Sequence, residues 1–318
     1  MLETFLATLS PMLVLFLCIV IGYILRAEKI LPENADKTIS RLLNYVFTPA
    51  LSLSTFMTNC TVDTLIKNGN NILYATLCVA IGICIATPLS KLFSRNDEYK
   101  RCIYKYSLTF ANFGFMGNSI VPAVLSVTDS QILYKYMLFT LPLSFVAYTW
   151  GVANLTPKGE KGESLIKRLF NPIIVALVIG AVIGLTGVSK YIPSFVIQTI
   201  DYCKVCMAPG GMLLTGFVIA GFPFKSLLKD KKIYIATFLR LIALPALLVG
   251  ILYLIKAPIT VMTMALFAFA MPLGLNTVIF PAAYGNDTKI GASMAMISHT
   301  LSVITIPIMF ALFQVIFK

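Results

Sequence analysis

The sequence predicts an all-α membrane protein with ten transmembrane helices, arranged as two inverted repeats of five helices each. Hydrophobic residues make up 58% of the 318 residues, and the mean hydropathy is +0.88. Apolar runs of about 20 residues, the length that crosses a bilayer, recur along the whole chain. Two of these runs resemble each other and carry glycine, asparagine and proline at their centres. Matched breaks in two halves of a chain are typical of secondary transporters.

The first apolar run is expected to remain in the protein as a helix and not to be cleaved as a signal peptide. The N-terminus has the acidic Glu3 and no basic residues before the apolar run, and no small-residue cleavage site follows it. The spans divide into repeats at residues 1–153 and 170–318, joined by a short polar cytoplasmic linker at 154–169. The ten expected spans cover residues 5–25, 36–57, 70–92, 103–126, 131–153, 170–187, 193–221, 233–255, 259–284 and 293–317.

Lysine and arginine predict the orientation of these spans. Most of the lysine and arginine residues lie in or beside the loops that follow spans 1, 3, 5, 7 and 9, and these loops are therefore expected in the cytoplasm. Both termini are then extracytoplasmic, in a plasma (inner) membrane. The net charge of +12 is explained by these loops and by anionic lipid, so no nucleic-acid partner is expected. The opposite face has only Lys67, Lys135, Lys190, Lys256 and Lys318.

The repeat is clearest in the two interrupted runs. Residues 110–123 align without a gap on residues 269–282, with Phe, Ala, Ile, Pro and the final Ala coinciding. Similar echoes, such as Pro49 with Pro209, lie about 160 residues apart. Because each half has an odd number of spans, the second half enters from the opposite face, and broken helices 4 and 9 meet near the midplane.

Broken helices suit the binding of an anion. Their half-helix N-termini present free N–H groups and a partial positive charge, which favour a carboxylate. The alternative is that the polar side chains there only cap freed backbone groups. The candidate substrate-binding residues at the crossover are Asn112, Gly117, Asn118, Asn276 and Thr277, and the prolines expected to break or kink helices are Pro49, Pro122, Pro209, Pro272 and Pro281.

Four ionisable residues, Asp201, Lys204, Arg240 and His299, fall well inside expected spans, where charge costs several kcal/mol. Asp201 and Lys204 are three residues apart on one helix face. They form either a self-neutralising pair, or an anion-attracting Lys204 with Asp201 as its release switch or a proton site. Arg240 is expected to reach towards the headgroups. His299, the only histidine, is either a packing residue or a site of proton coupling.

The sequence offers no support for an enzyme or for a bound cofactor or metal. It lacks an H-E-x-x-H ligand set, a G-x-S-x-G motif and paired intramembrane aspartates. Cys203 and Cys206 have C-x-x-C spacing, but a lone pair cannot complete a zinc site. A coupling proton or sodium ion is the only inorganic partner considered.

The chain resembles the auxin efflux carrier family over essentially its whole length. The resemblance rests on Asn112–Gly117, Asn171-Pro172, Met271-Pro272, Asn276–Phe280 and Tyr284–Asp287, together with Leu301–Pro307. It implies a ten-helix fold like that of NhaA or of bile-acid symporters, with spans 1, 2, 6 and 7 as scaffold and spans 3–5 and 8–10 as the moving domain. It also implies an organic-anion substrate and makes a homodimer plausible.

One position departs from the family pattern. Many members have proline two residues after the first crossover glycine, where this chain has Ser119, with Pro122 three residues later. The first break is therefore expected to be displaced towards the end of span 4.

Together these observations predict a secondary transporter that moves a small organic anion by alternating access at the helix 4/9 crossover. The alternative is a membrane sensor that binds ligand in the same pocket without transport. Coupling by protons through Asp201 or His299, by sodium at crossover carbonyls, or uncoupled uniport all remain open. The substrate and the direction of transport are not in the sequence.

Overall fold

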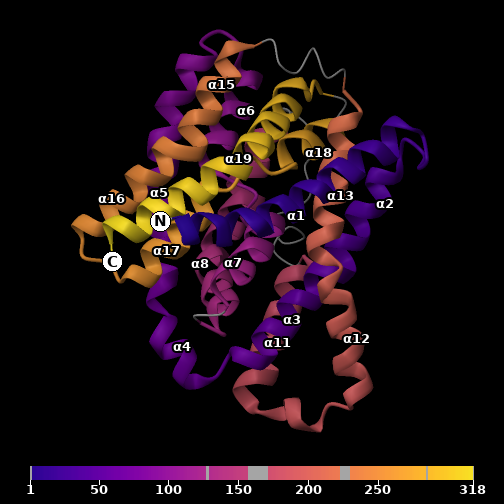
Figure 1. The fold of residues 1–318 in the computed structure, drawn as a ribbon, viewed down its shortest axis with the longest axis vertical. Coiled ribbons are helices and arrows are strands. Elements are labelled where there is room, and N and C mark those ends of the chain that lie inside the picture. The colour runs from indigo at the N-terminus through magenta and orange to yellow at the C-terminus, as the bar shows by residue number, and fades with distance from the viewer. Residues whose placement is uncertain (1, 127–128, 157–170, 223–229, 284–285, 318) are drawn as a thin grey trace.

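The computed structural model describes residues 2–126, 129–156, 171–222, 230–283 and 286–317. Helices and loops make up these parts, and no strand occurs in them, which confirms the all-α class (Figure 1). Residues 157–169 of the predicted linker lie outside the described parts. Seven helical segments are long and apolar enough to cross a membrane, so the chain is an integral membrane protein. Two shorter apolar helices, Pro172–Thr186 and Ile259–Ala270, accompany them.

The first half consists of helices that are often interrupted within one expected span. Its elements are α1 (Leu2–Ala27), α2 (Ala35–Leu42), η1 (Leu43–Phe47), α3 (Thr48–Asn59), α4 (Val62–Asn68), α5 (Asn70–Phe93), α6 (Glu98–Thr109), η2 (Phe113–Gly117), α7 (Asn118–Leu125), α8 (Ile132–Val146), η3 (Ala147–Gly151) and α9 (Val152–Leu155).

The second half repeats the alternation of long and interrupted helices. Its elements are α11 (Pro172–Thr186), η4 (Val188–Tyr191), α12 (Ser194–Val205), α13 (Met207–Ala220), α15 (Lys231–Phe238), η5 (Leu239–Ala243), α16 (Leu244–Leu254), α17 (Ile259–Ala270), α18 (Asn276–Ala283) and α19 (Lys289–Ile316). Here η1, η2, η3 and η5 are single π-helical turns, and η4 is a 3₁₀ turn.

Pro49 and Pro209, both expected to kink helices, lie at irregular points of the helical chain. Pro49 lies in the first turn of α3, directly after the π turn η1. Pro209 lies in the first turn of α13, after α12 ends at Val205. Because the chain stays helical from α2 through η1 into α3, the missing N–H of Pro49 removes one hydrogen bond from a continuous helical stretch.

Glycines allow two helix pairs to pack backbone against backbone. A Cβ on Gly216 of α13 would lie 1.8 Å from the carbonyl oxygen of Ile19 on α1. A Cβ on Gly180 of α11 would lie 2.6 Å from that of Leu53 on α3. In Figure 1, α1 reaches α13, and α3 lies beside α11. Small residues at such contacts are typical of helix packing in membranes.

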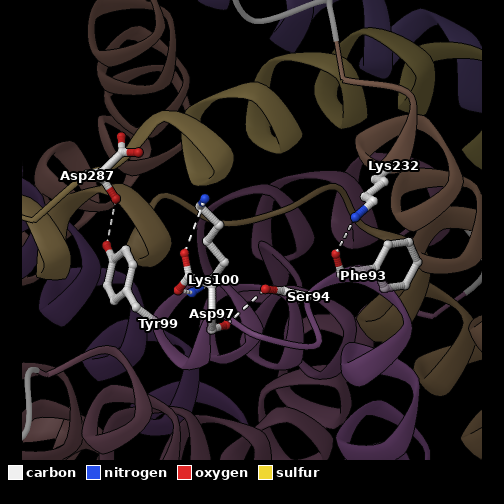
Figure 2. Close-up of polar contacts among 7 residues, drawn as sticks. All are labelled: Phe93, Ser94, Asp97, Tyr99, Lys100, Lys232 and Asp287. Carbon is white, nitrogen blue, oxygen red and sulfur yellow. Dashed lines mark hydrogen bonds and ion pairs between the residues drawn. The ribbon is translucent and has the colours of Figure 1, made fainter.

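A set of polar contacts ties the two halves together at one end of α6 and α19 (Figure 2). Lys232 Nζ donates to the carbonyl of Phe93 at 2.9 Å, and the hydroxyl of Tyr99 donates to that of Asp287 at 2.6 Å. Asp97 caps α6 by accepting from the backbone N–H of Lys100 at 3.0 Å. All of these residues except Tyr99 line an open polar cavity of about 890 Å³. The contacts join α5 and α6 to α15 and to the start of α19.

Candidate functional site

The two resembling segments are both broken helices, as the sequence predicts. Helix α6 ends at Thr109, and Phe110 and Asn112 leave the helical conformation before the π turn η2 begins. Helix α17 ends at Ala270, Met271 is extended, and α18 begins at Asn276. Each break therefore leaves one half-helix C-terminus and one half-helix N-terminus at the same depth along the span.

The expected displacement of the first break towards Pro122 is wrong. Pro122 lies inside α7, and the chain leaves the helix at Phe110–Asn112 instead. A single proline removes only one backbone donor, and a membrane helix can accommodate that loss. The break is set by residues that adopt non-helical angles, such as Asn112 with φ −80° and ψ 48°.

The two breaks meet through their backbones. The N–H of Asn112 donates to the carbonyl of Pro272 at 2.7 Å, which joins the first break directly to the second. The N–H of Leu273 donates to Ser298 Oγ at 3.0 Å, and the hydroxyl of Tyr136 donates to the carbonyl of Phe113 at 3.1 Å. Backbone groups freed by the breaks thus find partners inside the protein, as the membrane interior requires.

A cavity of about 100 Å³ opens beside this junction. The breaks form one wall, α3 and the start of α11 form another, and α8 and η3 close it. Three of the predicted substrate residues, Asn112, Asn118 and Asn276, line it. The other polar side chains in the lining are Thr48, Ser52, Thr140, Ser144, Tyr148 and Asn171, and no charged side chain is among the lining residues.

Three polar atoms in this lining are buried without a hydrogen-bond partner. They are Thr48 Oγ1, Ser52 Oγ and Asn118 Oδ1, and Ser52 is fully buried. Buried polar groups in proteins are almost always paired, so each unpaired atom requires an explanation. In this conformation the three atoms have almost no accessible surface, so a change of side-chain or helix position is needed before a polar ligand or water can reach them.

The asparagines at the breaks are held by side chains from neighbouring helices. Asn276 Nδ2 donates to the hydroxyl of Tyr106 at 2.7 Å. Asn112 Nδ2 lies 3.4 Å from His299 Nε2, and the other ring nitrogen of His299 lies 2.7 Å from the carbonyl of Ala295. His299 is therefore linked to the cavity through Asn112, although it does not line it.

Gly117 and Thr277 stand at the breaks but outside the cavity lining. Gly117 packs so closely on Tyr136 that a Cβ would lie 2.0 Å from its hydroxyl oxygen. Thr277 is fully buried, and Gly291 of α19 packs so closely on its backbone carbonyl that a Cβ on Gly291 would collide with the carbonyl oxygen. Both residues therefore pack the breaks against their neighbours.

Lys204 and Asp201 form a pair outside the cavity. Lys204 Nζ lies 2.6 Å from Asp201 Oδ1, and Ser54 of α3 bridges the two, accepting from Lys204 at 3.0 Å and donating to Asp201 at 3.2 Å. Neither residue is among the cavity lining. This geometry is that of the self-neutralising pair.

The expectation that Arg240 reaches towards the headgroups is wrong. Its side chain is fully buried, and its three guanidinium nitrogens have no hydrogen-bond partner among the described residues. Arg240 lies in the π turn η5, which packs against α17 and α19 in the interior. The free nitrogens leave its role unexplained.

Sequence reasoning missed several residues that shape the site. Ser52, Tyr106, Tyr136 and Ser298 are common residue types in membrane spans and belong to no motif or spacing. Only the fold brings them to the breaks. Thr48, beside Pro49, also lines the cavity.

The described part of the chain holds no group of three or more His, Cys, Asp or Glu side chains that could bind a metal. Cys203 and Cys206 are free thiols, and Cys206 Sγ donates to the carbonyl of Tyr202 at 3.4 Å.

A family model described as "Membrane transport protein" matches residues 7–310. An uncharacterized transporter from Methanocaldococcus jannaschii is 22% identical over 305 residues, covering 94% of this chain and 96% of the relative. An uncharacterized transporter from Methanothermobacter thermautotrophicus is 21% identical over 309 residues, covering 96% of this chain and 98% of the relative. The similarity to these proteins extends over nearly the whole chain.

Proposed function

The chain belongs to the auxin efflux carrier family of membrane transport proteins, and we propose that it is a secondary transporter of a small carboxylate anion. The cavity between the two helix breaks carries this proposal. Its wall contains the asparagines of both breaks together with neutral hydroxyl and amide side chains from α3, α8 and the start of α11.

The chemistry of the lining favours an anion held by neutral groups. The half-helices that follow the breaks begin at Phe113 (η2) and Asn276 (α18), and both residues line the cavity, so two half-helix N-termini with N–H groups that lack intrahelical partners face it. Each N-terminus stabilises nearby negative charge by about 0.3–1 kcal/mol at exposed sites, and by up to about 2 kcal/mol in partly buried ones. Hydroxyl and amide groups add hydrogen bonds without fixed charge. Such a site binds an anion weakly enough to release it.

The volume of the cavity limits the size of the substrate. About 100 Å³ is well below the 300–1,000 Å³ typical of sites for drug-sized molecules. It equals roughly three water molecules at liquid density. We therefore expect a short aliphatic carboxylate, and we expect an aromatic acid of auxin size to require a wider conformation.

The position of the cavity supports movement by alternating access. It lies between α3 and α11, which belong to the expected scaffold, and the breaks, which belong to the expected moving domain. We propose the ten-helix 5+5 inverted repeat for this chain, with the helix 4/9 crossover as the substrate site. The close glycine contacts of α1 with α13 (spans 1 and 7) and of α3 with α11 (spans 2 and 6) support it, because the repeat, in which span 1 corresponds to span 6 and span 2 to span 7, exchanges one pair with the other.

Two tests separate this proposal from a membrane sensor. Purified protein is screened for thermal stabilisation by short mono- and dicarboxylates, and active compounds are then tested for uptake into proteoliposomes. The proposal predicts both stabilisation and uptake. Binding without uptake at any pH or membrane potential favours the sensor, and stabilisation by cations or neutral solutes alone contradicts the carboxylate.

Variants locate the site. Asn118→Ala and Asn276→Ala are expected to weaken carboxylate binding about 10-fold or more, because each loses hydrogen bonds to a charged ligand. Asn71→Ala is the matched control, since Asn71 is also a buried asparagine with an unpaired Nδ2 but does not line the cavity. Equal effects of all three substitutions would argue against this cavity as the site.

A further inference from the structure

The single histidine of the chain is buried one hydrogen bond away from the cavity. His299 is 1% exposed, on α19, and its Nε2 lies 3.4 Å from Asn112 Nδ2. Asn112 lines the cavity, whereas His299 does not. The histidine can therefore influence a ligand only through the asparagine.

The second hydrogen bond of the ring fixes its tautomer. His299 Nδ1 lies 2.7 Å from the carbonyl oxygen of Ala295, which can only accept, so Nδ1 carries a proton. In the neutral ring, Nε2 is then an acceptor, and it receives the N–H of the Asn112 amide. Asn112 Oδ1, an acceptor, is the end of the amide that remains for other partners.

Protonation reverses this arrangement. When Nε2 takes a proton from water, it becomes a donor and can no longer receive the amide N–H. The Asn112 amide must turn over so that Oδ1 accepts from Nε2–H, and its NH₂ group then takes the place of Oδ1. A carboxylate oxygen can only accept hydrogen bonds, so it is complementary to the protonated state and repelled by Oδ1 in the neutral state.

The surrounding charges strengthen this link. The elements packed against α19 carry no buried acidic side chain in their described parts, and α13, α17 and α18 carry no titratable side chain there. A protonated His299 would therefore be a buried cation with no buried carboxylate on these described elements to balance it, until an anion enters. The titratable or basic side chains on the packed elements that are at least partly buried are Arg240 of η5, Tyr99, Arg101, Cys102, Tyr104, Lys105 and Tyr106 of α6, and Cys18, Tyr23 and Arg26 of α1.

We propose that His299 is the proton site of the transport cycle, and that it couples one proton to one carboxylate by reversing the amide of Asn112. This inference rests on the proposed carboxylate transport and names its co-substrate. The proton adds one positive charge to Nε2 and the carboxylate brings one negative charge, so the pair moves without net charge for a monocarboxylate. Binding of each then favours binding of the other by the same factor.

The test counts protons taken up when acetate or malonate binds to the purified full-length protein. Calorimetry in buffers of different ionisation enthalpy gives this number directly. We expect about one proton per acetate, and an affinity that rises towards tenfold per unit of falling pH between about pH 8 and pH 5. In His299→Gln, whose amide can bond to Asn112 but does not titrate, proton uptake and most of the pH dependence should disappear.

A matched control removes the other candidate proton site. The double variant Asp201→Asn/Lys204→Met should keep proton uptake, because the pair lies outside the cavity lining and outside the hydrogen bonds of His299. Uptake lost in this variant but kept in His299→Gln would overturn the inference and assign coupling to Asp201.

The outcomes separate the inference from the proposed function. Carboxylate binding with no proton uptake by the unmodified protein overturns the inference alone, even if His299→Gln fails to fold. Absence of carboxylate binding at every pH overturns both. Acetate uptake into proteoliposomes that exceeds uptake into protein-free liposomes, is driven by an inward proton gradient and is insensitive to membrane potential supports the inference.

Discussion

Replacing Gly117 with alanine is expected to destabilise the protein because the new methyl group collides with Tyr136. A Cβ at Gly117 would lie 2.0 Å from the hydroxyl oxygen, 2.8 Å from Cζ and 3.1 Å from Cε1 of Tyr136. Tyr136 is fully buried, and its hydroxyl donates to the carbonyl of Phe113 at 3.1 Å. Accommodating the methyl group therefore moves the ring and breaks a hydrogen bond to the first crossover.

The expected cost combines two effects. Overpacking of a dense interior costs about 1–3 kcal/mol. A buried carbonyl left without its donor adds about 1–3 kcal/mol. The free energy of unfolding, measured in detergent by chemical denaturation, should therefore fall by about 2–6 kcal/mol. Gly114→Ala is the matched control, because Gly114 lies in the same π turn and a Cβ there meets nothing within 4 Å.

A double-mutant cycle tests the stated cause. Tyr136→Phe removes the oxygen that lies 2.0 Å from the new Cβ, although Cζ at 2.8 Å remains close. The double variant Gly117→Ala/Tyr136→Phe should therefore be more stable than the sum of the single effects predicts, by about 0.5–3 kcal/mol. Strictly additive effects, or a Gly117→Ala protein as stable as Gly114→Ala, would refute the collision with Tyr136.

Three further predictions concern the α1–α13 contact, the partly exposed Lys204–Asp201 ion pair and the N-terminus of α6. Gly216→Ala should strongly lower the melting temperature, because its Cβ would lie 1.8 Å from the carbonyl oxygen of Ile19. Gly250→Ala is the control, because a Cβ there has no neighbour within 4 Å. Similar melting temperatures of the two variants would contradict the close α1–α13 contact. Lys204→Met should lower the melting temperature more than the double variant Lys204→Met/Asp201→Asn, because the single change leaves Asp201 without its cation. The double variant should bind carboxylates with near-normal affinity. Loss of carboxylate binding in the double variant would indicate that Lys204 belongs to the binding site. Asp97→Ala should cost about 0.5–2 kcal/mol and Asp97→Asn much less, because Asp97 caps α6. The backbone N–H of Lys100 holds the pKa of the Asp97 carboxyl below its ordinary value of 3.8, so the stabilisation by Asp97 is present above that pH and is lost as pH falls through the folded-state pKa. The unfolding free energies of Asp97→Ala and of the unmodified protein should therefore converge in acid. A difference that persists in acid would contradict this role of Asp97.

The sequence was sufficient to identify the two broken segments, although not the exact position of the first break, because glycine, asparagine and proline destabilise a helix inside an apolar span. Their recurrence after about 160 residues also predicted that Asn112 and Asn276 would meet at one site. The cavity lining and the Asn112–Pro272 hydrogen bond support that expectation. The relation between the breaks was thus visible in the residues that form them.

The remaining features depend on which helix faces pack together. Pro122 attracted attention as a helix breaker, yet one missing donor is tolerated inside α7. Arg240 was expected near the headgroups because its distance along the span allowed it, but η5 faces the interior. Ser52, Tyr106 and Tyr136 carry no sequence signal, since hydroxyl side chains in membrane helices often bond to their own backbone.

The most direct test of the carboxylate site is the labelling of a cysteine placed at Ser52. Ser52 lines the cavity, and its hydroxyl has no partner, so Ser52→Cys in a background without the seven native cysteines puts one thiol in the proposed site. We predict that membrane-impermeant thiol reagents modify it from either side of the membrane, and that a transported carboxylate slows the reaction from both sides. Modification from both sides at a rate that no transported carboxylate changes would contradict the assignment of this cavity as the substrate site.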